Sequence, residues 1–372
     1  MEILALQAVG FRNLAPTETE FAPRFNVITG NNGQGKTNLL EAVAVLGNLQ
    51  SFRTADHRRI VTHEQSRYQL VGRAAGTTGG RRLAQQAEVG PPLRRTLEVD
   101  GRTAPVERYL TAVPVVTIVP NDRALVLGEP AVRRSFLDRF AFLLEPALYH
   151  ELRLYRRLLR QRNAGLVDAD DRTLEAFEQM MAPAAAGVVI RRRRAMTRLA
   201  AVFGTVYEGL SGEGFPAVTL SYRGEAWLSH EETPTAVENA YLRRYNANRA
   251  RDRLVGYTVE GPHRHDLGLR ACGRAVRDVL SSGQSKVVVA ALRLAMLEEV
   301  ERERGEQLPV IVDDIDAELD RAVLGNLVRR LSTGRQVLLS CADSERVLPI
   351  LPGSRRLHLK AGICTEVATC GE

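Results

Sequence analysis

The pattern of apolar positions at the two ends of the chain predicts short strands beside a helix. Residues 2–12 and 25–29 are mainly apolar runs of the kind that form strands. Apolar side chains then recur at helical spacing over 37–46. Far downstream, 308–312 and 336–340 are again short apolar runs that are typical of buried strands. Both ends of the chain therefore favour an α/β structure.

Polar and apolar positions between these ends predict more strands and then a change of character. Residues 68–72 and 95–101 alternate, and the second run ends in the hairpin-turn dipeptide Asp100-Gly101. Residues 113–119 predict a buried strand that ends at Pro120. From about residue 131 the pattern becomes helical instead.

The helical pattern covers about 131–209 and includes two long amphipathic stretches, 146–162 and 173–209. In the first of them, apolar side chains gather on one side, opposite several arginines. Strand and loop signals return from about Gly256. We therefore expect an α/β unit formed by 1–125 and 256–372, with a mostly helical arm inserted as 126–255.

Composition narrows the class of protein. The 372-residue chain has a net charge of +7 and a pI near 9.5, which favours contact with nucleic acid or an anionic surface. No apolar run approaches the ~18 residues that span a bilayer, and the first residues resemble a strand more than a signal peptide. The four cysteines form no C-x-x-C pair and fit reduced thiols. These features predict a cytoplasmic protein with no membrane partner.

The residues between the second strand and the first helix fit G-x-x-x-x-G-K-[ST], a phosphate-binding loop. They are Gly30, Asn31, Asn32, Gly33, Gln34, Gly35, Lys36 and Thr37, followed by Asn38 in the helix. Lys36 is one of three lysines in a chain with 48 arginines. A compact ammonium can lie along such a loop, whereas a planar guanidinium does not fit there. The loop predicts bound ATP, with the Thr37 hydroxyl on Mg²⁺; the alternative is a glycine-rich turn before a surface helix.

A pair of carboxylates follows the strand at 308–312. Asp313 is expected to hold Mg²⁺ through water, and Asp314 to orient or deprotonate the attacking water. An apolar strand that ends in two such residues is a Walker B pattern. The alternative is a pair of aspartates that cap a turn.

The run Leu280-Ser281-Ser282-Gly283-Gln284 resembles the L-S-G-G-Q signature of ABC-type ATPases, with serine at the third position. On its own it would indicate only a serine N-cap of the following helix. In ABC-type ATPases the signature contacts the γ-phosphate bound by a second subunit, so the resemblance implies an ATP-dependent homodimer in which Ser281, Gly283 and Gln284 complete the partner's site. Residues 317–320 are similar to the D-loop of that family.

Further motifs make the chain resemble the RecF family of bacterial recombination mediators, which are ABC-type ATPases related to SMC heads. The similarity runs nearly end to end and is carried by Phe11-Arg12-Asn13-Leu14, Ser51-Phe52-Arg53-Thr54, Arg133-Arg134-Ser135-Phe136-Leu137-Asp138, Arg160-Gln161-Arg162-Asn163-Ala164 and Gly261-Pro262-His263-Arg264-His265-Asp266-Leu267. The family often has an acid where His265 stands. The resemblance implies an ABC-type ATPase head, a P-loop NTPase fold, with an inserted helical arm.

By the same resemblance, the protein is expected to bind single-stranded and gapped double-stranded DNA as an ATP-bound dimer. It would help RecO and RecR to load RecA in DNA repair and replication restart, with slow ATP hydrolysis as a timer. One alternative is the nucleotide-binding subunit of an ABC transporter, which the lack of a switch histidine after 336–340 disfavours. A small-molecule P-loop kinase is the other, and it has no use for the signature.

Several residues have open interpretations. The run Arg191–Arg194 cannot place four charges on one helix face, so some of them are expected on a solvated side; the alternative is that one or two arginines contact phosphate. His263 and His265 have a spacing compatible with metal, but no cysteine or third histidine is near them in sequence. Lys286 fits either a surface position or a contact with DNA or the partner's phosphate. Asn121 is a candidate sensor of Mg²⁺ or of the attacking water.

Overall fold

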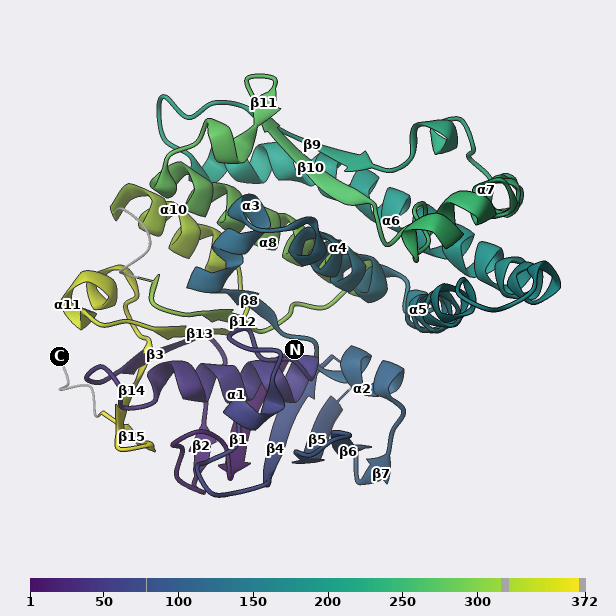
Figure 1. Ribbon diagram of the computed structural model, residues 1–372. Coiled ribbons are helices and arrows are strands. Elements are labelled where there is room, and N and C mark those ends of the chain that lie inside the picture. The colour runs from purple at the N-terminus through teal and green to yellow at the C-terminus, as the bar shows by residue number, and fades with distance from the viewer. Residues whose placement is uncertain (78, 316–320, 368–372) are drawn as a thin grey trace. The chain divides into compact units, whose positions relative to one another are not determined.

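Figure 1 shows the computed structural model, which describes residues 1–77, 79–315 and 321–367 in two compact units. The first unit comprises Met1–Arg123, Thr205–Phe215 and Leu280–Glu372. The second comprises Ala124–Gly204 and Pro216–Val279. The phosphate-binding loop, the carboxylate pair and the signature all belong to the first unit. The proposed D-loop at 317–320 lies outside the described residues.

A mostly parallel sheet organises the first unit, with strand order β15-β14-β3-β13-β12-β8. Its strands are β3 (Phe25–Thr29), β8 (Val116–Ile118), β12 (Val310–Val312), β13 (Val337–Ser340), β14 (Arg355–Lys360) and β15 (Ile363–Glu366). All neighbours pair in parallel except β14 and β15. Both β12 and β13 are buried along their whole length, as expected for a parallel sheet covered on both faces. The α/β unit predicted from the two ends of the chain is confirmed.

A second, antiparallel sheet has the order β2-β1-β4-β5-β6-β7. Its strands are β1 (Glu2–Val9), β2 (Glu18–Glu20), β4 (Arg67–Gly76), β5 (Gly79–Glu88), β6 (Arg94–Val99) and β7 (Arg102–Thr103). The predicted hairpin turn is present between β6 and β7, where Asp100 and Gly101 have φ of 55° and 75°. The left-handed conformation at both positions explains the Asp-Gly pair.

Helix α1 (Lys36–Asn48) fills the space between the two sheets (Figure 1). Ten of its residues are buried, and the seven from Leu39 to Leu46 that are apolar share one hydrophobic core with strands of both sheets. The described part of this unit also contains α2 (Val106–Ala112), α8 (Ser282–Arg304), α10 (Arg321–Leu331), α11 (Ser344–Val347) and the end of α6 (Asp171–Leu210), with 3₁₀ turns at His57–Arg59, Pro120–Arg123 and Leu348–Ile350. The buried α1 fixes the start of the helix, and therefore the phosphate-binding loop, relative to β3.

The second unit is mostly helical. It contains α3 (Ala124–Leu127), α4 (Pro130–Leu144), α5 (Leu148–Gly165), most of α6 (Asp171–Leu210) and α7 (Pro234–Val255), with 3₁₀ turns at Ala226–Leu228 and Val276–Asp278. A small antiparallel sheet has the order β11-β10-β9, formed by β9 (Val218–Arg223), β10 (Asp266–Ala271) and β11 (Arg274–Ala275). The long helices bury a core that includes Tyr155, Tyr241 and Tyr245.

The unit boundaries differ from the sequence expectation on the C-terminal side. The helical arm was expected to end at 255, but the second unit continues to Val279. The reason is that β10 pairs with β9 over six residues, which holds 266–271 to a strand that precedes α7 in the sequence. Such a pairing is non-local, so the hydrophobic pattern of 256–279 alone does not show which unit it joins.

The run Arg191–Arg194 on α6 contacts protein at every position. Arg191 pairs with Glu151, and Arg194 with Glu145. Arg192 is only 3% exposed and pairs with Asp138, while Arg193 donates to the carbonyls of Leu228 and Glu231. The four side chains diverge, as the helical geometry requires. The expectation of a solvated charge fits Arg194, whose side chain is 62% exposed. It does not fit Arg192, which is buried.

His263 is held by two hydrogen bonds that define its neutral tautomer. Its Nε2 lies 3.0 Å from the Thr258 carbonyl oxygen, which can only accept, so Nε2 carries the hydrogen. Nδ1 therefore accepts from the Tyr155 hydroxyl at 2.6 Å. Burial lowers the pKa of His263 to about 4. Among the described residues, no group of three or more His, Cys, Asp or Glu side chains could hold a metal.

We expect His263→Gln to weaken the acid sensitivity of the fold. Between pH 6.5 and about 4 the unfolded chain binds a proton at His263 that the folded protein does not, so stability falls as the pH falls. The whole effect is up to about 3 kcal/mol. Urea unfolding at pH 7 and pH 4 measures it, with the exposed His230→Gln as the control. Equal losses of unfolding free energy in His263→Gln and wild type would contradict this prediction.

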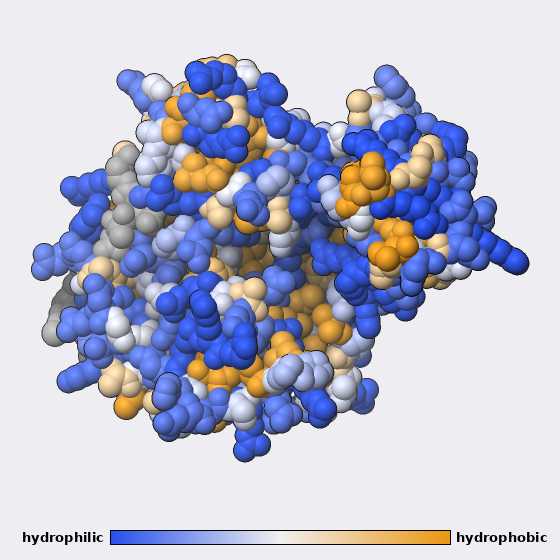
Figure 2. Space-filling model, viewed as in Figure 1, coloured by the Kyte–Doolittle hydropathy of each residue, from blue (hydrophilic) through white to orange (hydrophobic). Residues whose placement is uncertain are grey.

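Polar residues cover most of the face shown in Figure 2, and exposed hydrophobic residues form scattered patches between them. Val167 and Leu254 are the most exposed large hydrophobic side chains, at 84% and 87%. Within the described ranges, no helix combines the length and the apolar character needed to cross a membrane.

Candidate nucleotide-binding site

The loop between β3 and α1 requires glycine for two separate reasons. The backbone φ is 141° at Gly30, 79° at Gly33 and 112° at Gly35, a range that L side chains rarely adopt. A Cβ on Gly30 would also lie 2.4 Å from the Leu359 carbonyl oxygen, and one on Gly35 would lie 2.8 Å from Asn13 Oδ1. The loop therefore offers backbone amides where another sequence would place side chains.

The side chain of Lys36 folds back along this loop. It is 7% exposed, and its Nζ donates to the Gly30 carbonyl at 2.6 Å and to the Asn31 carbonyl at 3.4 Å. The ammonium is thus held by carbonyl oxygens of the loop whose N–H groups would surround a phosphate. This is the position expected of a lysine that reaches the outer phosphates of a nucleotide.

The N-terminus of α1 adds a favourable potential for an anion. Gly35 occupies the N-cap position in the left-handed conformation, and no side chain caps the helix. The first N–H groups of a helix have no partner within it, and the helix dipole is positive at this end. A phosphate bound by the loop would accept from these groups.

Thr37 links the loop to the carboxylate pair, which lies almost three hundred residues away in sequence. Its hydroxyl donates to Asp313 Oδ1 at 3.1 Å. The same oxygen accepts from the Ser340 hydroxyl at 2.7 Å. Burial raises the pKa of Asp313, and the repulsion from Asp314 adds to it, while the bonds from Ser340 and Thr37 act in the opposite direction.

Asp314 is oriented through its backbone. Its φ of 55° lies in the left-handed region, and its N–H donates to the Ser340 hydroxyl at 2.8 Å. One serine at the end of β13 therefore contacts both carboxylate residues at the end of β12. Ser340 was not among the residues singled out from the sequence. The pairing of β12 with β13 is what places it there, and no sequence motif signals it.

A cluster around Glu41 gives a role to two motifs that the sequence analysis quoted without one. Glu41 lies on α1, is fully buried, and forms a bidentate pair with Arg12 at 2.8 and 2.9 Å. The Ser51 hydroxyl donates to the same carboxylate at 2.5 Å, and Arg53 lies 3.6 Å from it. The segments before and after the loop are thereby fastened to one buried charge.

The side chains of Asn38 and Gln34 are also held by protein. Asn38 donates to Asn13 Oδ1 at 2.7 Å and accepts from Arg53 at 2.8 Å. Gln34 Oε1 accepts from the Ala361 N–H at 2.7 Å. Both were predicted to bind nucleotide, and their engaged side chains leave the backbone amides as the groups that face a phosphate.

The Asn121 amide donates to the Phe52 carbonyl at 3.0 Å, so it holds the segment after α1. The neighbouring Asp122 forms a bidentate pair with Arg293 of α8, at 2.5 and 3.1 Å. Sequence reasoning did not identify this pair. It joins the segment after β8 to the helix that begins at the signature.

The signature lies at the exposed start of α8. Ser281 is the N-cap, and its hydroxyl accepts from the Gln284 N–H at 3.2 Å. The Gln284 side chain accepts from the Ser281 N–H at 3.0 Å, which completes a capping box. The hydroxyl hydrogen of Ser281 is not used in this contact, and a Cβ on Gly283 would meet nothing within 4 Å. No contact among the described residues joins Ser281, Gly283 or Gln284 to the loop of the same chain.

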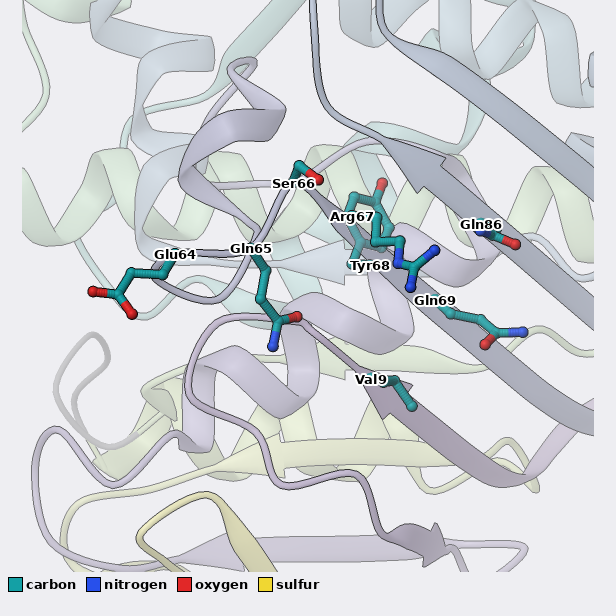
Figure 3. A pocket seen from close by; sticks show the side chains of 8 residues that line it. All are labelled: Val9, Glu64, Gln65, Ser66, Arg67, Tyr68, Gln69 and Gln86. Atoms are coloured by element: carbon teal, nitrogen blue, oxygen red, sulfur yellow. The ribbon is translucent and has the colours of Figure 1, made fainter.

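The first unit contains two hollows of different size. A small one of about 40 Å³ is lined by Asp313, Lys286, Arg123 and apolar side chains, so Lys286 lies on the same hollow as the first residue of the carboxylate pair. A larger, open one of about 640 Å³ lies on the antiparallel sheet (Figure 3) and is lined by Val9, Glu64, Gln65, Ser66, Arg67, Tyr68, Gln69 and Gln86. None of the residues predicted to bind nucleotide lines the larger hollow.

Comparison with known proteins gives one consistent family. The model of the RecF/RecN/SMC N terminal domain matches residues 2–348. The DNA replication and repair protein RecF of Anaeromyxobacter sp. strain Fw109-5 is 37% identical over 357 residues, which are 94% of each chain. A structure described as RecF-ATP of the RecFOR pathway has a TM-score of 0.89 at 22% identity and covers 99% of this chain and 98% of that one. The Smc head domain of Pyrococcus furiosus has a TM-score of 0.54 at 14% identity, with 98% and 96% covered. The predicted ATPase-head fold is confirmed.

Proposed function

The chain belongs to the RecF branch of the RecF/RecN/SMC family, and on this premise we propose that it is an ATP-dependent DNA-binding protein of DNA replication and repair. The name of the similar Anaeromyxobacter protein supports the process, and the ATP in the similar RecF structure supports the ligand. The net charge of +7 is suited to a nucleic acid partner.

The contact between Thr37 and Asp313 carries the proposal. It joins the end of β12 to the start of α1, so the loop and the carboxylate pair form one site. Lys36 and the loop amides bind the phosphates, while Thr37 and Asp313 hold Mg²⁺. Asp314 orients the attacking water.

The residues present fit these ligands. A glycine cradle that excludes a Cβ suits a phosphate, and one hydroxyl beside one carboxylate suits Mg²⁺, which keeps phosphate and water oxygens as its other ligands. When bound, Mg²⁺ supplies charge neutralisation to the phosphates. Burial raises the pKa of Asp313, which means that its charged form is destabilised. A nearby cation would stabilise that charged form, so the site favours a bound metal ion.

The signature completes the site of a second copy of the chain. Its exposed position, and the hydrogen of the Ser281 hydroxyl that the capping box does not use, support a contact with an anion that comes from outside the protomer. Two chains would thus close on two ATP molecules and form a clamp on single-stranded or gapped double-stranded DNA. ATP hydrolysis is slow in this proposal and times the opening of the clamp.

We place the clamp in the recombination pathway with RecO, RecR and the RecA filament. The RecFOR pathway named for the similar structure supports this assignment. A transporter subunit is not favoured, because the relatives that cover 94% of the chain are DNA replication and repair proteins.

The test is DNA binding with and without ATP across a salt series, together with ATP turnover on gapped duplex DNA. We expect binding to strengthen with ATP and to weaken as salt rises, because phosphate contacts release counterions. Turnover should rise with gapped DNA. A protein whose turnover and binding are indifferent to DNA would exclude this function and leave the P-loop kinase as the better explanation.

A further inference from the structure

The second unit contains a pocket of about 240 Å³ whose polar lining is dominated by positive charge. Helix α4 contributes Arg134, Ser135 and Asp138, α5 contributes Arg156, and α6 contributes Arg192. His263 borders it from the loop before β10. Three motifs that are far apart in sequence therefore meet here, and none of them belongs to the nucleotide site.

The only carboxylate in this lining is already neutralised. Asp138 Oδ1 accepts from Arg192 Nε at 2.7 Å, and Oδ2 accepts from Arg156 at 3.1 Å. Arg192 is buried and also donates to the Pro262 carbonyl at 2.5 Å, so it is fixed in place. Three guanidinium groups face one carboxylate, and His263 is neutral because burial lowers its pKa to about 4. The pocket therefore keeps an excess of two positive charges.

The two arginines in excess have donors to spare. Arg134 donates a single hydrogen bond to a described residue, from one terminal nitrogen to the His265 carbonyl at 2.9 Å. Burial, and then the repulsion from Arg192, lower the pKa of Arg134, while Asp266 and Asp138 act in the opposite direction. The side chain of Arg156 is 60% exposed and contacts Asp138 through one nitrogen. A guanidinium carries five N–H donors, so most of those on Arg134 and Arg156 are available to a ligand.

We propose that this pocket binds a phosphate group carried on a nucleic acid strand. Two guanidinium forks and the exposed Ser135 hydroxyl match the oxygens of a phosphate diester, which arginine binds through paired hydrogen bonds. The partial exposure of Arg156 suits a group that stays attached to a chain outside the pocket. This inference rests on the proposed DNA binding and adds a place for it on the helical unit.

The pocket is also built to keep its shape. Arg133 forms a bidentate pair with Asp266, 2.8 Å at each nitrogen, which fixes the start of α4 against β10. Gly261 has a φ of 141°, and a Cβ there would lie 2.4 Å from the Tyr155 hydroxyl. The chain therefore passes close to α5 and sets His263 at the border of the pocket. These contacts give the arginine–arginine and glycine–proline–histidine motifs a shared structural role.

The experiment compares Arg134→Gln and Arg156→Gln with Arg157→Gln. Arg157 is the next residue on α5, is also exposed, and does not line the pocket. Binding to gapped DNA is measured with ATP from low to high salt. For each pocket variant we expect the slope of log affinity against log salt to be shallower by about 0.7 to 0.9, the value of one lost phosphate contact. Arg157→Gln should keep the wild-type slope.

The outcomes separate this inference from the proposed function. Wild-type protein that fails to bind DNA at any salt overturns both. Wild-type binding with equal slopes in all three variants overturns only the pocket, because the charge then acts diffusely. A second measurement records thermal stability with inorganic phosphate. If phosphate stabilises wild type more than Arg134→Gln while the DNA slopes agree, the pocket holds the free ion and the proposal is wrong. If Arg134→Gln does not fold, the more exposed Arg156→Gln decides.

Discussion

Lys36→Met is expected to abolish ATP binding, a loss of at least a hundredfold in affinity, which corresponds to about 3 kcal/mol. The reason is that the ammonium lies among the loop carbonyls, 2.6 Å from that of Gly30, where the outer phosphates would be bound. Methionine has a similar length but no charge and no donor. Isothermal titration with ATP and Mg²⁺ measures the change directly.

Two further variants sharpen this result. Lys36→Arg keeps the charge and should still bind poorly, because Lys36 is 7% exposed and leaves no room for a planar guanidinium. Lys360→Met removes an exposed lysine near the loop and should bind ATP normally. Native affinity in Lys36→Met would show that the loop is only a glycine-rich turn. Full recovery in Lys36→Arg would show that charge alone is required.

Ser281→Arg is expected to bind ATP with wild-type affinity but to remain monomeric when ATP is added. Ser281 is exposed and contacts no residue of its own chain's loop among those described, so its replacement should leave that loop intact. A bulky arginine would occupy the space in which the partner's phosphate must lie. Light scattering with and without ATP gives the mass of the complex.

Ser281→Asp separates this steric and charge effect from the loss of the helix cap. Aspartate is as good an N-cap as serine, so α8 keeps its stability, whereas losing the cap would cost about 1 kcal/mol. Its negative charge, however, would repel a γ-phosphate. We expect Ser281→Asp to fold normally, bind ATP and fail to dimerise. Normal ATP-dependent dimers of both variants would mean that the signature serves only to cap α8.

The motifs of the candidate nucleotide site could be recognised in the sequence because each of them is local. The loop and the carboxylate pair each occupy a few consecutive residues with a spacing that the chemistry demands. Ser340 and Glu41 were not predictable, since each acquires its role through tertiary contacts. Glu41 in particular appears as an ordinary polar position of α1, yet it is fully buried beneath Arg12 and Ser51.

The fold follows a similar division. The strands at 25–29, 308–312 and 336–340 were predicted because buried parallel strands are mainly apolar. The C-terminal boundary of the helical unit was not, because β9 and β10 pair across more than forty residues. The pattern of polar and apolar residues in β10 is compatible with either unit. Only its pairing with β9 shows that β10 belongs to the helical unit.

The order of strands in the parallel sheet has a consequence for how the protein is made. Strands β3 and β8 come from the first third of the chain, yet β13 and β12 lie between them. During translation, a chain that has not yet been extended to residue 340 therefore lacks the complete strands that hold β3 and β8 in one sheet. Contacts of such long sequence separation form slowly. The strands on both sides of β3 are thus made only after most of the chain, and a prematurely terminated chain would carry its phosphate loop on an incomplete sheet.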